Sequence, residues 1–286
     1  MDGDMWTHPP VVQHVQTLRS RGVVVLDPEV GPLASGQIAQ GRLSEEPKIV
    51  AAVNSVLDSR CDWQNQVVLV SAGPTQEPID PVRFLSNRSS GKMGYAIAAA
   101  AKARGAEVIL VSGPSSLSPE PGITTVRVNT AAEMADALCR YFPTCTVLIM
   151  AAAVADFRPK ESFAQKVKKQ GKTDMVLELE ATPDILAMLS ARRTSQIMVG
   201  FAAETELMLS HATDKLNAKG LDLIVANDVT QTGGGFGSDD NAAIILSARG
   251  EQRDLGLMSK RRLADEILTA VHELCLVRPC QKVLAE

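Results

Sequence analysis

The chain has 286 residues, of which 45% are hydrophobic, and its 29 basic and 33 acidic residues give a net charge of −4. This length allows a large buried core, and the nearly neutral charge argues against a nucleic-acid-binding surface. The five cysteines form no CxxC pair and none lies near a histidine at ligand spacing, which argues against a zinc site and a disulfide framework and favours a reducing, cytoplasmic environment.

The N-terminal part predicts a short α/β segment. Pro10 starts a helix, an apolar strand follows at 23–27, residues 31–43 form a glycine-rich loop, and a second helix comes next. The start "MDGDMW" lacks the basic residues of a signal peptide, and no apolar run approaches ~18 residues, so we expect no membrane segment. This part is too small to fold alone comfortably, and we divide the chain into domains 1–62 and 63–286.

From residue 66 onward, strand and helix signals alternate. The predicted strands are 66–72, 107–112, 145–151, 175–179, 196–201, 221–226 and the segment "AAIILSA"; the predicted helices are 91–104, 131–141, 183–191, 204–219 and 259–275. This alternation predicts a Rossmann-like, three-layer α/β/α fold with a mostly parallel sheet. Ligands of such sheets bind at the carboxyl ends of the strands, where "SAGPT", "MAAAVAD", "GFAAET" and "ANDV" stand.

The stretch "LSNRSSGKMG" contains glycine, serine and lysine, which are typical of phosphate-binding loops. It is not a Walker A loop, because Ser86 and Met93 occupy positions that this motif reserves for glycine and for serine or threonine. The helix that begins near Gly91 still exposes backbone amides and the positive end of its dipole, beside Ser89 and Ser90. Two interpretations stay open: an anion site, or a serine that caps a helix whose glycine packs against the sheet.

Two groups of lysines could also meet an anion. Four lie close together in a polar segment, at positions 166, 168, 169 and 172. Such a run is usually a solvated loop, although a flexible cationic segment after a strand end could fold over a polyphosphate. Lys215 and Lys219 are one helical turn apart, an arrangement that suits an anion clamp but is also common on exposed helix faces.

A nucleotide-dependent oxidoreductase on a similar sheet is disfavoured. The GxGxxG pattern is missing after the first strand of the main domain. A Tyr-x-x-x-Lys motif is missing too, since Tyr95 and Tyr141 are followed four residues later by Ala99 and Cys145. The four histidines form no HExxH motif or catalytic pair.

Several motifs, in order along the chain, resemble one enzyme family. They are "SAGPTQEPIDPVRFLSNRSSGKMGYAIAAAA", "AAAVADFRP", the Lys-x-Lys-Lys run, "ATPDIL", "VGFAAET" and "LIVANDV". Over about residues 66–276 the chain is similar to the phosphopantothenate–cysteine ligase domain of the bacterial bifunctional coenzyme A biosynthesis protein. The resemblance implies a homodimeric ligase that activates 4'-phosphopantothenate with CTP, carried with Mg²⁺, and joins the acyl-cytidylate to L-cysteine. Such chemistry needs cations and oriented amides to bring two anions together.

The resemblance also implies the roles of individual residues. Lys166 would help to form the acyl-cytidylate, and Asn87 would hold this intermediate and complete the second step. Ser89, Ser90 and Gly91 would hold the substrate's phosphate. The nucleotide site carries over to Met150, Ala151, Ala152, Asp156, Lys166, Thr182, Pro183, Asp184, Ile185, Phe201, Lys215 and Lys219. The preference for CTP over ATP follows from the resemblance alone, since no side chain reads cytosine unambiguously.

The N-terminal part resembles the end of the flavodoxin-like decarboxylase domain that accompanies this ligase. "MDGDMW" and "GPLASGQIAQGRL" carry the resemblance. Asp2 stands where that family has asparagine, Ser35 stands where it has the cysteine that protonates the product, and the flavin-binding half is missing. We therefore predict no FMN binding and no decarboxylation, with a separate flavoprotein decarboxylase as a candidate partner. The alternatives are a non-catalytic, degenerate ligase fold and an NAD(P)-binding protein; intact Asn87 and Lys166 argue against degeneracy.

Overall fold

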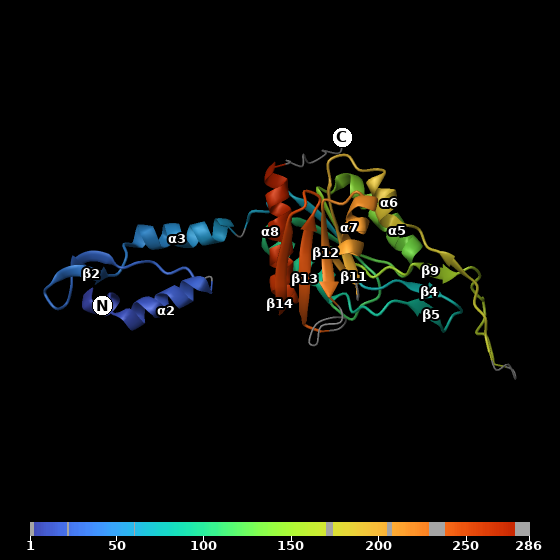
Figure 1. Cartoon of the computed structure of the whole chain (residues 1–286), viewed down its shortest axis with the longest axis horizontal. Helices are drawn as coiled ribbons and strands as arrows, with labels where there is room; N and C mark the ends of the chain where they lie inside the picture. The colour runs from blue at the N-terminus through green and yellow to red at the C-terminus, as the bar shows by residue number, and fades with distance from the viewer. Residues whose placement is uncertain are drawn as a thin grey trace. The chain divides into compact units, whose positions relative to one another are not determined.

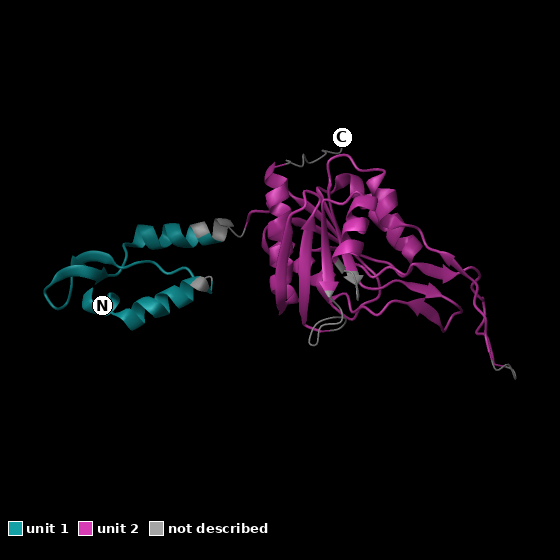
Figure 2. Ribbon diagram, viewed as in Figure 1, with its two compact units in different colours: residues 1–60 teal, residues 61–286 magenta. Residues whose placement is uncertain are grey.

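The computed structural model describes residues 3–21, 23–59, 61–169, 174–204, 208–228 and 238–277. The chain folds as two compact units, residues 1–60 and 61–286 (Figure 2). In the described residues, no helix is both long enough and apolar enough to cross a membrane.

The first unit holds three helices and one hairpin: α1 (Gly3–Trp6), α2 (Pro9–Ser20), β1 (Glu29–Pro32), β2 (Ile38–Arg42) and α3 (Glu46–Ser59). The strand predicted at 23–27 is wrong, because β1 and β2 pair with each other and leave Val23 and Val24 exposed without a partner strand. The predicted loop 31–43 is instead the larger part of this hairpin, which turns at Gly36 with a φ of 83°. Asp2 lies outside the described residues, and the link to a decarboxylase stays a prediction.

The second unit is built on an eight-stranded sheet. In spatial order its strands are β7 (Thr124–Arg127), β6 (Glu107–Ser112), β3 (Val67–Ala72), β8 (Val147–Met150), β11 (Ile197–Glu204), β12 (Leu223–Asp228), β13 (Asp240–Ser247) and β14 (Gln252–Ser259). The first six are parallel to one another, and β13 pairs antiparallel with both β12 and β14, so the predicted mostly parallel sheet is confirmed. The first strand of this sheet along the chain, β3, lies in the middle. The order in which later strands are added reverses between β3 and β8, and ligands of such sheets bind at this point.

Helices cover both faces of this sheet (Figure 1). On one face lie α4 (Lys92–Ala103) and α8 (Lys260–Val277); on the other lie α5 (Ala131–Tyr141), α6 (Ile185–Ser190) and α7 (Met208–Ala218). Strand residues alternate between the two cores: Val68 and Val70 pack toward α4 and α8, whereas Val67 and Leu69 pack toward the opposite helices. Both faces are buried, which explains why the central strands are continuous apolar runs.

Some elements differ from the prediction. Strands β7 and β14 were not expected, because each lies at an edge of the sheet and its side chains do not show the apolar pattern of the buried strands. The strand predicted at 175–179 is wrong. The strand there is β10 (Leu179–Ala181), which pairs with β9 (Phe157–Pro159) outside the main sheet.

Two small hairpins project from the carboxyl edge of the sheet. One pairs β4 (Gln76–Pro78) with β5 (Phe84–Ser86), and the other pairs β9 with β10. Between β9 and β10 the chain runs out as a long arm, of which residues 160–169 and 174–178 are described (Figure 1). The hairpins and the arm therefore extend the edge at which the predicted ligand site lies.

Candidate active site

The loops that follow β3 and β8 are bound to each other. Pro74 forms a β-bridge with Ala153, and the Ala153 amide donates to the Gly73 carbonyl at 2.9 Å. The Ala155 amide donates to the Thr75 hydroxyl at 3.0 Å. These contacts make one continuous surface of backbone at the point where the sheet reverses direction.

Glycines let the start of α4 approach this surface closely. Gly91 has a φ of 82°, and a Cβ atom there would lie 3.2 Å from the Gly73 backbone. Ser89 and Ser90 lie beside it, and their hydroxyls accept from the Gly91 amide at 3.3 Å and the Lys92 amide at 3.5 Å. The N-cap of α4 is Gly91 and no side chain caps the helix, so neither serine is the cap that one interpretation expects, while both hydroxyls lie at the end where an anion would be favoured.

Asn87 is held over the loop that follows β8. Its side-chain amide donates to the Val154 carbonyl at 2.9 Å, and the preceding Ser86 hydroxyl donates to the Thr75 carbonyl at 2.7 Å. The side chain of Asn87 is exposed. The structure therefore brings this predicted residue to the carboxyl edge between β3 and β8, with its amide accessible.

Part of the predicted nucleotide site follows β8 directly. Three of its residues are consecutive at the end of this strand: Met150, Ala151 and Ala152. The Thr182 hydroxyl donates to the Ala155 carbonyl at 2.6 Å, and its amide donates to the Asp156 carbonyl at 2.9 Å. The segment that leads into α6 is thereby tied to the loop after β8. Pro183 is half-buried, and the side chain of Ile185 belongs to the core, so only its backbone can contribute to a site.

Lys215 in the last turn of α7 and Lys219 directly after this helix, the two clamp lysines, contact neighbouring elements. Lys215 donates to the carbonyl of Phe201 in β11 at 2.8 Å, and Lys219 forms an ion pair with Asp184. Asp184 also caps α6 by accepting from the Ala187 amide at 3.0 Å. Burial is the largest single influence and raises the pKa of Asp184, but the hydrogen bonds from Lys219 and the Ala187 amide, together with the charges of Lys219 and Lys215, outweigh it and lower that pKa below its ordinary value.

Lys166 is not brought into this group. It is exposed on the arm, and the neighbouring Val167 is bonded to Asp80 and Arg83 of the β4–β5 turn. Lys172, the last lysine of the predicted cluster, lies outside the described residues.

Asp80 is a buried charged residue that the sequence analysis missed. It is 4% exposed, and the Arg83 guanidinium beside it holds the pKa of its carboxyl far below the usual range. The signal was present in the sequence as an aspartate and an arginine three positions apart in "EPIDPVR", within a segment otherwise read as loop.

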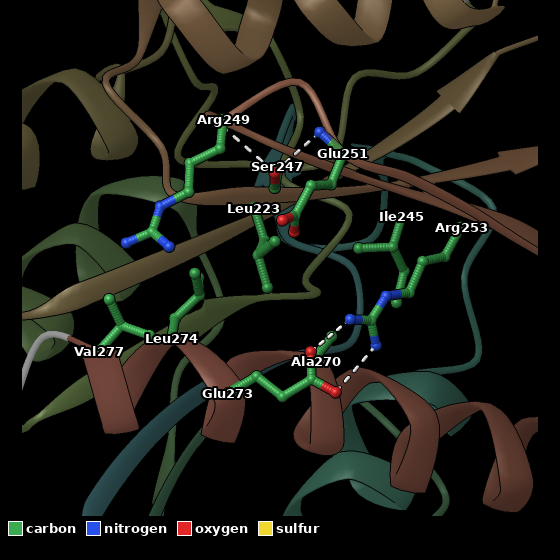
Figure 3. Close-up of a pocket in the computed structure, with 10 residues that line it drawn as sticks. All are labelled: Leu223, Ile245, Ser247, Arg249, Glu251, Arg253, Ala270, Glu273, Leu274 and Val277. Atoms are coloured by element: carbon green, nitrogen blue, oxygen red, sulfur yellow. Dashed lines mark hydrogen bonds and ion pairs between the residues drawn. The ribbon is translucent and has the colours of Figure 1, made fainter.

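Two hollows lie away from these residues. One of about 310 Å³ lies between β4, β9 and the start of α5. The other, of about 210 Å³, lies between the β13–β14 hairpin and α8, and Figure 3 shows Arg253 paired with Glu273 in it. It reaches Leu223 at the amino end of β12, opposite the carboxyl edge described above. Neither hollow is lined by a residue predicted to bind the nucleotide.

The fold and this edge define a doubly wound α/β domain, a class in which ligands bind at the topological switch point. The comparisons with known proteins are consistent with that class. Residues 63–274 match the family of the DNA/pantothenate metabolism flavoprotein C-terminal domain. The coenzyme A biosynthesis bifunctional protein CoaBC of Bacillus subtilis (strain 168) is 44% identical over 277 residues, which are 96% of this chain and 68% of the relative.

Solved structures agree with the family match. The crystal structure of the C-terminal domain of a CoaBC protein covers 76% of this chain and 99% of its own, with 41% identity and a TM-score of 0.66. A histidine-to-alanine variant of Cab2, solved in complex with phosphopantothenate-cysteine, covers 82% of this chain and 96% of its own; at 19% identity and a TM-score of 0.61 it supports the fold alone.

The chain belongs to the DNA/pantothenate metabolism flavoprotein C-terminal domain family. It carries the phosphopantothenate–cysteine ligase domain of the coenzyme A biosynthesis protein CoaBC, so the resemblance predicted from the sequence motifs is confirmed.

Proposed function

We propose that this chain joins 4'-phosphopantothenate to L-cysteine at the expense of CTP, through an acyl-cytidylate. The observation that carries the proposal is the position of Asn87. Its amide lies over the loop after β8, beside the elements that carry the predicted nucleotide residues and next to the start of α4. A neutral amide there can both donate to an acyl or phosphate oxygen and accept from a donor.

The reaction requires two substitutions. In the first, the pantothenate carboxylate attacks the α-phosphorus of CTP, a new O–P bond forms, and pyrophosphate leaves. In the second, the cysteine amine attacks the acyl carbonyl, the C–N bond forms, CMP leaves with the C–O electron pair, and the amine loses a proton. Both steps place negative charge next to negative charge, so fixed cations and amides at this edge lower the barrier.

The two lysines at the end of α7 are suited to the phosphates of the nucleotide. Lys215 and Lys219 now bind a carbonyl and a carboxylate, groups that a polyphosphate would replace. The small side chains of Ala151 and Ala152 leave the backbone after β8 approachable. The half-buried Phe201 is placed to pack against the base or ribose.

Magnesium fits this edge as an ion carried by the triphosphate. In the described part of the chain, no group of three or more histidine, cysteine or acidic side chains could hold a metal by itself. Mg²⁺ sites commonly use one or two carboxylates together with substrate phosphates and water. Asp156, an exposed carboxylate at the end of the β8 loop, is the residue that would hold the ion, which supplies charge neutralisation.

The start of α4 is the proposed site for the phosphate of phosphopantothenate. The Ser89 and Ser90 contacts to the helix amides are 3.3 and 3.5 Å long, so they are weak hydrogen bonds that a phosphate can replace. Changing both serines to alanine should weaken the affinity for phosphopantothenate. An unaltered affinity would contradict this placement.

Pyrophosphate release tests the proposed function. We expect release only when CTP and phosphopantothenate are both present, and its loss in Lys166→Gln. Lys160→Gln is the matched control, because Lys160 is exposed at the start of the same arm and lies outside the lysine cluster, so the rate should stay near that of the wild type. Release without phosphopantothenate, or a change in NAD(P)H absorbance, would favour another function. Thermal shifts with CTP and ATP side by side would test the nucleotide preference.

The first unit is proposed to lack decarboxylase activity. Ser35 occupies the place of the proton-donating cysteine of the family that this part resembles, in the turn between β1 and β2. A thiol is a better acid than a hydroxyl, so this serine cannot replace it in protonating the product. Purified protein that bound FMN and released CO₂ from phosphopantothenoylcysteine would contradict the proposal, and co-purification with a flavoprotein would identify the expected partner.

A further inference from the structure

We infer that Asp80 is a positioning residue for the ligation: it fixes the base of the arm that carries Lys166 to the hairpin that leads to Asn87. The amide of Val167, the residue after Lys166, donates to Asp80 Oδ2 at 3.1 Å. The carbonyl of Val167 accepts from Arg83 Nη2 at 2.7 Å. Both backbone groups of Val167 are therefore bound by one ion pair.

The Asp80 carboxylate also builds the turn between β4 and β5. It accepts from the amides of Val82 and Arg83, each at 2.9 Å, and from Arg83 Nε at 3.0 Å. A second guanidinium nitrogen, Arg83 Nη2, donates to the same oxygen, Oδ2, that accepts from Nε and from the Val167 amide. Because Asp80 is only 4% exposed, its charge is stable there only while these donors are in place.

A second bond fastens the arm to the same turn. The Phe163 amide donates to the Ile79 carbonyl at 2.9 Å, four residues before Val167. The arm is thus held at two points, and Lys166 lies one residue, about 3.8 Å of backbone, from one of them. The position of its Cα is set by the turn, while its side chain is exposed.

The same hairpin connects this anchor to Asn87. After Arg83 the chain enters β5 (Phe84–Ser86) and reaches Asn87 immediately. The two residues proposed to be catalytic therefore extend from one rigid hairpin, although 79 positions separate them in the sequence. The expected effect on the rate rests on the proposed function. The anchoring of the arm to the turn does not depend on that function.

Asp80→Asn tests the anchoring. Asparagine keeps one acceptor oxygen and carries an NH₂ group, which donates, in place of the oxygen that faces Arg83. The hydrogen bond from the Val167 amide to this oxygen should therefore be lost. We expect faster deuterium exchange in a peptide covering 163–167 by mass spectrometry. Glu77→Gln is the matched control, because Glu77 is also a buried acid of this hairpin, 2% exposed on β4. Its carboxylate accepts from the Ala131 amide of α5 at 2.8 Å, which lies outside the arm. Unchanged exchange in Asp80→Asn would overturn the inference.

Kinetics separate positioning from a general effect on the fold. At saturating CTP, Asp80→Asn should lower the rate of pyrophosphate release about 10- to 100-fold, while the thermal shift caused by CTP is preserved. When Asp80→Asn is added to Lys166→Gln, the residual rate should fall no further. If Asp80→Asn lowers the rate by the same factor in the wild type and in Lys166→Gln, the inference is refuted. If Lys166→Gln itself keeps full activity, the proposed role of Lys166 fails; if the wild type releases no pyrophosphate with CTP and phosphopantothenate, the proposed function fails, and in both cases the exchange result still decides the anchoring.

Val167→Pro is the second variant, should Asp80→Asn fail to fold. Proline has no backbone N–H, so this variant removes the hydrogen bond that Asp80 accepts from residue 167 and leaves the hairpin unchanged. We expect the same fold-loss in rate as in Asp80→Asn. A wild-type rate in a folded Val167→Pro protein would overturn the inference.

Discussion

At the scale of single residues, glycines decide how closely the loops of the active edge pack. A Cβ atom on Gly113, after β6, would lie 1.8 Å from the carbonyl oxygen of Pro74. A Cβ atom on Gly94, in the first turn of α4, would lie 2.5 Å from the Cβ of Ala72. Backbone meets backbone at Gly113, so no side-chain movement can relieve a contact there. The surface formed by the loops after β3 and β8 therefore depends on this glycine.

Gly113→Ala should destabilise the second unit by about 3 kcal/mol, the upper part of the range for overpacking. It should also weaken nucleotide binding, because Pro74 is bridged to Ala153 after β8. Denaturant unfolding and a CTP thermal shift would measure both effects. Gly250→Ala is the control, since no atom lies within 4 Å of its Cβ position and only its φ of 86° opposes the change, at about 1 kcal/mol. Equal losses in the two variants would contradict the steric explanation.

At the scale of elements, one arginine joins three parts of the second unit. Arg104, at the end of α4, donates to Asp62 at 2.9 Å and to the Asp265 carbonyl and Thr269 hydroxyl of α8 at 3.1 Å. It also lies 5.8 Å above the ring of the fully buried Trp63. The start of this unit is thus tied to the helix pair on one face of the sheet.

Asp62→Asn should cost about 1.5 kcal/mol of stability at pH 7, the lower end of the range for a hydrogen bond to a charged group. Burial raises the pKa of Asp62, but the Arg104 hydrogen bond and charge lower it more, so it lies below the ordinary value of 3.8. A carboxyl with a depressed pKa stabilises the fold above that value and loses its effect as the pH falls through the folded-state pKa. The difference from wild type should therefore shrink below about pH 3.8.

Unfolding curves at pH 7 and in the acid range would measure this difference. Asp265→Asn is the control, because Arg104 bonds to the backbone carbonyl of Asp265. A gap between Asp62→Asn and wild type that does not change with pH would contradict the assigned ion pair.

At the scale of the whole molecule, the two hairpins present apolar side chains to solvent. Val82 is 57% exposed, Phe84 50%, Phe157 56% and Leu179 48%. Large exposed groups of this kind mark interaction surfaces in soluble proteins. They support the expected homodimer, with the two hairpins proposed as its contact.

Phe84→Ser together with Phe157→Ser should shift the protein from dimer to monomer in analytical ultracentrifugation. The circular dichroism spectrum should stay that of the wild type, because both side chains are exposed within their own chain. Lys168→Gln, on the arm, should leave the dimer intact. A wild-type protein that is monomeric at micromolar concentration would refute this surface.

The division into two units predicts that the ligase unit works alone. A chain that starts at Cys61 keeps the whole sheet and its helices. The similar C-terminal domain of CoaBC, at 41% identity, has been crystallised by itself. We expect CTP- and phosphopantothenate-dependent pyrophosphate release from residues 61–286 within about twofold of the full chain. Loss of the activity in a folded truncated protein would show that the first unit contributes to the ligase.

The sequence by itself determined the class of fold, the family and most central elements. Val67–Ala72 and Val147–Met150 are apolar runs that only a strand buried on both faces explains, and helix Ala131–Tyr141 starts at a capping box of Thr130 and Glu133. These signals are local, so they can be read without knowing what packs against them. The motifs also predicted Asn87 and the residues after β8 as site residues, and these lie at one edge of the sheet.

Only the tertiary structure decided which separated residues meet. The edge strand β14 was missed because an exposed strand has little apolar pattern, and the strand predicted at 23–27 was wrong because no partner pairs with it. Asp80 and Val167 are 87 positions apart and carry no shared pattern. Their bond exists because chain topology brings an arm and a turn together, and a sequence signal that spans only neighbouring residues cannot encode such a contact.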